Sequence, residues 1–164
     1  MLGFSKTVGY AVQALSCLDE HEPHLNKDLG AALTIPKAYL CKVINRLAHE
    51  GLVETKRGRK GGIVLSRAPE KITLLQVVKA VEGSDWMDPC MLGMDTCVAL
   101  RFCPFSTFWE DLRNRVETAL RTTTLADIIA QKNRTATRSA SSQPSQACAT
   151  PFAPEAAEQD AMRP

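Results

Sequence analysis

The stretch IPKAYLCKVINRLAHEGLVETKRGRKGG, residues 35–62, decides the fold of this chain. Pro36 suits the first turn of a helix, where its missing N–H costs nothing, and Gly51 is a typical C-terminal stop. Between them, apolar side chains recur every three or four residues, at Leu40, Val43, Ile44 and Leu47. The spacing predicts a helix that ends at about His49, with one buried face and a small, polar face on the opposite side.

A β-hairpin is predicted directly after this helix. Two runs of β-prone residues, 52–55 and 63–66, are joined by a Gly-rich cationic loop, and together they have the composition of a wing. Residues 37–67 carry eight Lys or Arg against two Glu, whereas the whole chain has a net charge of only +2. A basic segment in an otherwise acidic molecule indicates a polyanionic partner, although a charge run alone is also common on ordinary solvated surfaces.

The residues upstream complete a helix-turn-helix. Asn26 is a suitable N-cap for a short helix that carries Leu29 and Leu33, and the sequence TIP at 34–36 forms a tight turn before the second helix. A helix, a tight turn, a helix and a basic hairpin, in this order, are typical of a winged helix-turn-helix. The alternative is that the helix pair only packs the core and that the hairpin is a basic surface turn.

The second helix and the wing supply the candidate DNA contacts. The outer face of the helix is expected to meet base edges or flanking phosphates in the major groove, through Lys37, Ala38, Tyr39, Cys41, Lys42 and Asn45. In the wing, cations can neutralise phosphates and glycines let the backbone approach the duplex, which selects Arg57, Arg59, Lys60, Gly61 and Gly62. Arg46 and Lys56 are assigned to phosphate contacts or to surface charge. Oxidation of Cys41 would block base contact directly, unless its small side chain is only tolerated there.

The first helix is predicted from apolar spacing at Val8, Ala11, Val12, Leu15 and Leu18. The same stretch loosely resembles a short signal core, but Gln13 and the single basic residue before it argue against export. No apolar run is long enough to span a membrane, so a cytoplasmic protein without membrane contact is expected.

Three further helices are expected after the wing. Thr73 and Gln76 form a capping box for a helix that ends at Gly83. Pro104 opens a long helix that carries the most aromatic stretch of the chain, and a short last helix begins at Thr124. From Gln131 no Leu, Ile or Val remains, so residues 131–164 are predicted to be a disordered tail.

Half of the six cysteines lie within the segment CMLGMDTCVALRFC, residues 90–103. Soft thiolates from one flexible segment can hold an iron–sulfur cluster, so Cys90, Cys97 and Cys103 are candidate ligands. Structural zinc sites usually contain cysteines two to four residues apart, which favours a cluster over zinc here. Three unligated thiols are the other alternative. Cys103 lies just before the helix that Pro104 opens, where the helix dipole favours a thiolate.

Residues 1 to about 130 resemble the Rrf-two family of bacterial winged-helix regulators. The matching pieces are SKTVGYAVQAL near the start, IPKAYLCKVINRLAHEGLVETKRGRKGG through the second helix and the wing, ITLLQVVKAVEG after the wing, and the three cysteines. The family includes the iron–sulfur cluster biogenesis regulator and the nitric-oxide-sensitive repressor. The resemblance implies a cytoplasmic homodimer that binds a roughly palindromic double-stranded DNA operator and dimerises through the long helix after the cysteines.

The resemblance also implies an iron–sulfur cluster, 2Fe–2S or 4Fe–4S, on the three cysteines. Where the cluster biogenesis regulator has a His three residues after its third cysteine, this chain has Ser106. Where the nitric-oxide sensor takes a carboxylate from the partner's first helix, this chain has Gly9. The remaining iron ligand is left open among a water, a small thiol, and the side chains of Asp85, Asp88, Asp95 and Ser106.

The sequence therefore predicts a mainly α fold with a small β-hairpin wing. The expected parts are a winged helix-turn-helix at 1–83 (helix-turn-helix about 27–50, wing 52–67), a cysteine loop at 84–103, dimerisation helices at 104–130 and the tail. The predicted function is transcriptional regulation in response to iron–sulfur status, nitric oxide or redox state. The alternative is a cluster-free regulator of the same family that acts by thiol redox or a protein partner. An enzyme is not expected, because the sequence contains no phosphate-binding Gly loop or nucleophile elbow.

Overall fold

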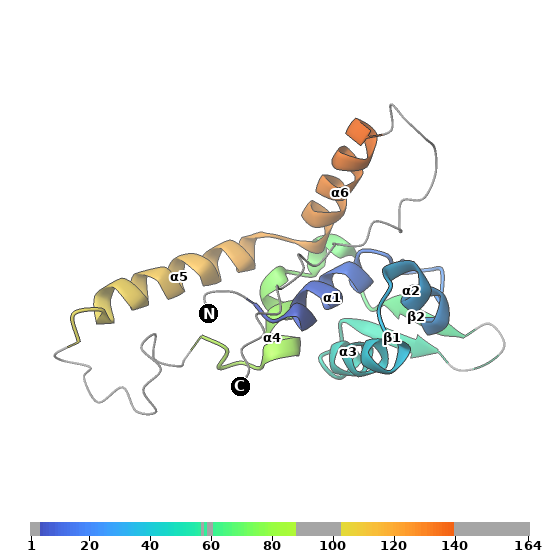
Figure 1. The fold of residues 1–164 in the computed structure, drawn as a ribbon, viewed down its shortest axis with the longest axis horizontal. Helices are drawn as coiled ribbons and strands as arrows, with labels where there is room; N and C mark the ends of the chain where they lie inside the picture. The colour runs from blue at the N-terminus through green and yellow to red at the C-terminus, as the bar shows by residue number, and fades with distance from the viewer. Residues whose placement is uncertain (1–3, 57, 59–60, 88–102, 140–164) are drawn as a thin grey trace, which may run out of the picture.

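The computed structural model describes residues 4–56, 58, 61–87 and 103–139 (Figure 1). Within these ranges the chain is mainly helical, with a single two-stranded antiparallel sheet. The elements are α1 (Lys6–Leu15), α2 (Asn26–Leu33), α3 (Lys37–His49), β1 (Val53–Lys56), β2 (Gly62–Leu65), η1 (Pro69–Lys71), α4 (Leu74–Glu82), α5 (Ser106–Thr122) and α6 (Leu125–Ser139). This order confirms the predicted fold class, a winged helix-turn-helix followed by a long helix.

The core is built around the apolar face of α3. Leu40 and Leu47 have no exposed surface, and Val43 and Ile44 are at most 3% exposed. This face packs against α1, α2, α4 and β1, while α4 also contacts α5. Burying each such side chain contributes about 1.5–3 kcal/mol, so α3 is fixed in rotation as well as in position.

The hairpin is fastened to the loop before α2. β1 and β2 pair from Val53 opposite Leu65 to Lys56 opposite Gly62. His24 then extends the sheet, because its N–H donates to the Ile63 carbonyl at 3.0 Å and its carbonyl accepts from the Ile63 N–H at 2.8 Å. A Cβ at Gly62 would lie 2.8 Å from the His24 carbonyl oxygen, so only glycine permits this approach.

Several predicted boundaries are shifted by one residue. The N-cap of α2 is Leu25 and not Asn26, and Asn26 is the first helical residue. Its side-chain amide donates instead to the Cys41 sulfur at 2.8 Å, a tertiary contact that competes with capping. Pro36 is the N-cap of α3 and not part of its first turn, whereas the predicted end at His49 is confirmed.

Two capping boxes hold the second half of the domain together. The predicted box is present at the start of α4, where Thr73 and Gln76 exchange side-chain and backbone hydrogen bonds. At the start of α6, the Asp127 carboxylate accepts from the Thr124 N–H at 2.8 Å and from its hydroxyl at 2.7 Å. These two hydrogen bonds lower the pKa of Asp127. The Leu74 N–H donates to the Thr123 carbonyl at 2.9 Å, so the two helix starts are joined directly.

The expected start of a disordered tail at residue 131 is too early. α6 continues to Ser139, and Figure 1 shows it turning away from α5 at the junction. Residues 131–135 contain Gln, Lys and Arg, which are good helix formers, and Lys132 reaches back to the Cys17 sulfur at 3.7 Å. None of the helices in the described ranges is long and apolar enough to cross a bilayer.

Replacement of Thr73 with Ala should lower the free energy of unfolding by about 1 kcal/mol, because the Gln76 N–H at the start of α4 loses its side-chain acceptor. Urea denaturation followed by circular dichroism measures the change. Thr73→Ser keeps the hydroxyl and should stay near wild type. Equal losses in the two variants would show that the threonine methyl, and not the cap, carries the effect.

Candidate nucleic-acid interface and cysteine segment

The face of α3 opposite the core is open to solvent. Lys37, Ala38, Lys42 and Asn45 are all exposed, as the helical period of the sequence predicts. Tyr39 is 36% exposed, and its ring meets Tyr10 of α1 edge-on at 5.6 Å while its hydroxyl is hydrogen-bonded to Thr7. Tyr39 therefore anchors the start of α3 to α1, and its expected DNA contact stays a prediction.

Arg46 ties the other half of α3 to α4. Its guanidinium donates to the Val81 carbonyl at 2.9 Å, near the C-terminal end of α4. Because the last carbonyls of a helix lack intrahelical partners, a cation in this position is favourable. Arg46 was predicted to contact phosphate or to be a surface charge. No sequence pattern indicated its hydrogen bond to the Val81 carbonyl.

A pocket lies where α3 meets the hairpin. Its volume is about 370 Å³, and it is open to solvent on one side. Cys41 and Asn45 of α3 line it together with Lys56 of β1, and Asn26 contributes from the start of α2. The remaining lining comes from Leu25, Ile44, Thr55, Gly58, Gly61, Gly62 and Ile63. Sequence reasoning did not place Asn26 here, because capping was the only signal it carried.

The wing is described only in part. Gly61 donates its N–H to the Gly58 carbonyl at 2.9 Å, which closes the turn, and Gly62 is held against His24. The predicted cationic contacts Arg57, Arg59 and Lys60 lie outside the described residues. The exposed face of α3 and the described glycines thus border one continuous surface around the pocket.

Of the three predicted cluster ligands, Cys103 is described. Its thiol is unbonded and half-buried, and its carbonyl accepts hydrogen bonds from the Ser106 N–H at 3.1 Å and hydroxyl at 2.8 Å. Cys90 and Cys97 lie outside the described residues, as do Asp88 and Asp95. Within the described ranges, no group of three or more His, Cys, Asp or Glu side chains could hold a metal ion.

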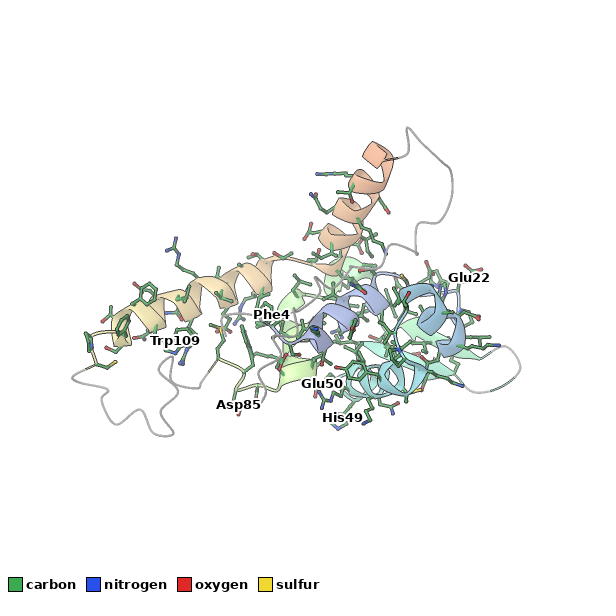
Figure 2. All side chains as sticks on the ribbon, in the orientation of Figure 1. Phe4, Glu22, His49, Glu50, Asp85 and Trp109 are labelled. Carbon is green, nitrogen blue, oxygen red and sulfur yellow. The ribbon has the colours of Figure 1, made fainter. Side chains whose placement is uncertain are left out.

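Two candidate fourth ligands, Ser106 and Asp85, are among the described residues. The Ser106 hydroxyl donates a hydrogen bond to the Cys103 carbonyl. Asp85 is exposed beside the end of α4, where Figure 2 labels it. Gly9 is exposed on α1, and a Cβ added there would meet nothing within 4 Å, so a group approaching from outside would find open space at this point.

The segment 84–103, called the cysteine segment below, begins at elements that contact α1. Trp86 packs on Phe4 with ring centroids 5.1 Å apart, and Figure 2 shows Phe4 beside α4. The Ser5 N–H at the start of α1 donates to the Glu82 carboxylate at 3.1 Å. The first residues of the cysteine segment and the last turn of α4 are therefore both fastened to the N-terminal end of α1.

Two aromatic side chains at the start of α5 are about half exposed. The N-cap Phe105 is 47% exposed and Phe108 is 53% exposed, whereas Leu120 is the only buried residue of α5. Trp109 lies beneath the Arg113 guanidinium at 5.8 Å, and its indole N–H is buried without a hydrogen-bond partner among the described residues. Figure 1 shows α5 extending away from the helices of the core.

Cys17 lies just after the end of α1. It packs against the core and is disulfide-bonded. Cys41 and Cys103 are unbonded in the same structure.

The helix-turn-helix, the hairpin and the exposed face of α3 define a winged helix-turn-helix DNA-binding protein. The family model for Rrf2, described as an iron-dependent transcriptional regulator, matches residues 4–131. The chain belongs to this Rrf2 (Rrf-two) family, as the sequence resemblance indicated. It is accordingly a transcriptional regulator and not an enzyme.

Curated relatives and solved structures agree with this assignment. The chain is 32% identical over 116 residues to the transcriptional regulator NsrR of Geobacillus kaustophilus, covering 70% of this chain and 79% of that protein. It is 32% identical over 123 residues to the regulator IscR of Erwinia tasmaniensis, covering 73% and 74%. The structure of CymR, the global cysteine regulator of B. subtilis, matches with a TM-score of 0.63 and 27% identity over 80% of this chain and 98% of that one. The T. potens IscR structure also matches with a TM-score of 0.63; it is 28% identical and covers 79% of this chain and 88% of that one.

Replacement of Lys42 with Gln should weaken binding to every duplex by a similar factor and reduce the slope of log affinity against log salt by about 1, because one phosphate contact is lost. Fluorescence anisotropy titrations at several salt concentrations measure the slope. Lys71→Gln is the matched control, because Lys71 lies in η1, which packs against α6. An unchanged slope in Lys42→Gln would place Lys42 outside the interface.

Proposed function

We propose that this protein is a cytoplasmic, homodimeric operator-binding regulator that senses iron–sulfur status, nitric oxide or redox state through a cluster held by Cys90, Cys97 and Cys103. The observation that carries the proposal is the placement of α3. Its polar face is exposed beside the hairpin, and its apolar face is fixed against the same helices that lead into the cysteine segment.

In the proposed interface, α3 enters the major groove and the hairpin follows the phosphate backbone. Lys37, Lys42 and Asn45 are exposed along one face, and these side chains suit phosphates and base edges. The wing cations Arg57, Arg59 and Lys60 add charge that DNA attracts over a distance. Ala38 and Gly61 allow close backbone approach. Arg46 contributes indirectly, by holding α3 at its angle to α4.

Dimerisation is proposed through α5. Phe108 in the 17-residue helix α5 and the N-cap Phe105 are each about half exposed, so the start of α5 presents aromatic surface that a partner can bury. A second copy of the same helix supplies a complementary apolar face by symmetry. Two α3 helices related by a two-fold axis would then read half-sites about one helical turn of DNA apart, which predicts a roughly palindromic operator.

The proposed cluster ligands are three thiols, a donor set whose softness suits iron. Cys103 lies three residues before Ser106, the first residue of α5, so a ligand there is covalently continuous with the proposed dimer helix. The family description as iron-dependent supports iron as the metal. A bound cluster would supply iron that reacts with oxygen, nitric oxide or chelators.

The protein's own contacts can carry a change in the cysteine segment to α3. Trp86 contacts Phe4, and Glu82 accepts from Ser5, so movement of the segment acts on the start of α1. α1 in turn holds Tyr39 through Tyr10, at the beginning of α3. Because two half-sites must be met at once, a small rotation of each α3 weakens contacts on both sides of the dimer.

Replacement of Cys97 with Ala should abolish bound iron, acid-labile sulfide and visible absorbance in protein purified without oxygen. Affinity for operator DNA should then no longer respond to nitric oxide or iron chelation. Cys148→Ala is the control, since Cys148 lies in the predicted tail. Iron content and operator affinity that both match wild type would eliminate the cluster mechanism.

A second candidate function is a cluster-free regulator that responds through thiol redox. The disulfide at Cys17 favours this function, because it shows a thiol in an oxidised state. Ser106 and Gly9 also favour it, because they stand at the positions where the resemblance predicts a fourth cluster ligand. Colourless, iron-free anaerobic protein whose DNA affinity changes on addition of dithiothreitol would establish this function in place of the first.

Replacement of Phe108 with Glu should convert the dimer to a monomer, because a charge would be buried in the apolar α5 contact. Sedimentation velocity measures the oligomeric state. Asn114→Glu adds the same charge on roughly the opposite side of α5 by the helical period, where the side chain is exposed, and should leave the dimer intact. A Phe108→Glu protein that sediments as a dimer would require another dimer surface.

A further inference from the structure

The pocket between α3 and the hairpin contains a reactive group that the proposed cluster mechanism does not use. Cys41 carries an unbonded, half-buried thiol on the wall of this pocket. We propose that Cys41 is a modification site: the pocket receives one half of a low-molecular-weight disulfide that bears a carboxylate, and the resulting mixed disulfide prevents DNA binding. The inference rests on the proposed DNA interface but requires no iron.

The thiol is both oriented and reachable. Asn26 donates its side-chain N–H to the Cys41 sulfur at 2.8 Å, which holds the side chain toward the start of α2. Ile44 and Ile63, which are nearly fully buried, give the pocket an apolar floor. The volume of about 370 Å³ is within the range of small-molecule sites, so an amino-acid-sized adduct fits.

Polar groups around the thiol match a zwitterionic adduct. Asn26 lines the pocket, and its side-chain oxygen is buried without a hydrogen-bond partner among the described residues, so an unsatisfied acceptor lies beside the thiol. Lys56 and Asn45 also line the pocket. Lys56 supplies a positive charge for a carboxylate, and Asn45 supplies a neutral amide. An adduct with only an ammonium would lack the Lys56 contact.

The reaction is a thiol–disulfide exchange. The Cys41 thiolate attacks one sulfur of the small disulfide, a new sulfur–sulfur bond forms, and the original bond breaks. The departing half leaves as a thiolate and takes up the proton that Cys41 released. The Cys41 sulfur is oxidised and the departing sulfur is reduced, so no other oxidant is needed, and dithiothreitol reverses the step.

The adduct would act at the DNA-facing surface itself. Cys41 is hydrogen-bonded to Asn26, and the hairpin glycines Gly58 and Gly61 line the same pocket. A group bound there separates the duplex from both α3 and the hairpin, and its carboxylate repels phosphates. Loss of binding is therefore expected in each half of the dimer independently.

The test treats the reduced, full-length protein with cystine, which carries carboxylates and ammonium groups, or with cystamine, which carries ammonium groups alone. Peptide mass spectrometry follows labelling at Cys41, with Cys103 of the iron-free protein as the internal control thiol. Cystine should label Cys41 at least tenfold faster than Cys103. Replacement of Lys56 with Gln should lower the rate with cystine severalfold and leave the rate with cystamine unchanged or higher.

DNA affinity is measured by fluorescence anisotropy, on a duplex that has been selected for binding to the reduced protein. For each variant, the readout is the ratio of the affinity of the cystine-treated protein to the affinity of the untreated protein. Cystine should lower affinity at least tenfold, reversibly with dithiothreitol, in wild type and in Cys103→Ser. The ratio should stay near one in Cys41→Ser.

Three outcomes would overturn the inference: no labelling of Cys41, an adduct that leaves affinity unchanged, or an adduct that unfolds the protein by circular dichroism. A reduced protein that binds no duplex at all would instead refute the proposed interface, and labelling of Cys41 would still be measurable.

Discussion

Burial of one face of α3 is the constraint on which the rest of the molecule depends. Leu40, Val43, Ile44 and Leu47 are removed from water by four other elements, and this fixes which side chains of α3 point outward. The outward orientation of the polar face is therefore a consequence of packing and needs no additional interactions to hold it. The tethers at Tyr39 and Arg46 act on the two ends of the same helix, so they adjust its angle without changing its exposed face.

Features encoded by local spacing could be predicted from the sequence. The buried face of α3, its end before Gly51 and the capping box at Thr73 each depend on residues within one or two helical turns. Features that depend on contacts between residues far apart in the sequence could not be predicted. Asn26 has the composition of a cap, yet its amide bonds to Cys41, fifteen residues away. Gly62 was predicted to let the backbone approach DNA, but its close contact with the His24 carbonyl inside the protein already requires a glycine.

The candidate sites divide in the same way. Exposure of Lys37, Lys42 and Asn45 follows from the helical period and was predictable. The pocket was not, because it forms where the start of α2, α3 and the hairpin meet, and no single segment contains its pattern. The tail boundary was predicted too early for a different reason: loss of Leu, Ile and Val removes packing energy but not helix propensity, so α6 continues to Ser139.

The two thiol sites would influence DNA binding through different physics. In the proposed mechanism, a change at Cys103 would act through the start of α5 and would alter the relation between the two α3 helices of a dimer. Such a change matters only when both half-sites are engaged. A group on Cys41 blocks the surface of each α3 separately, so it weakens binding to a single half-site as much as to a full operator, relative to the unmodified protein. Comparison of half-site and full-site duplexes therefore separates a signal read through dimer geometry from one read at the DNA surface itself.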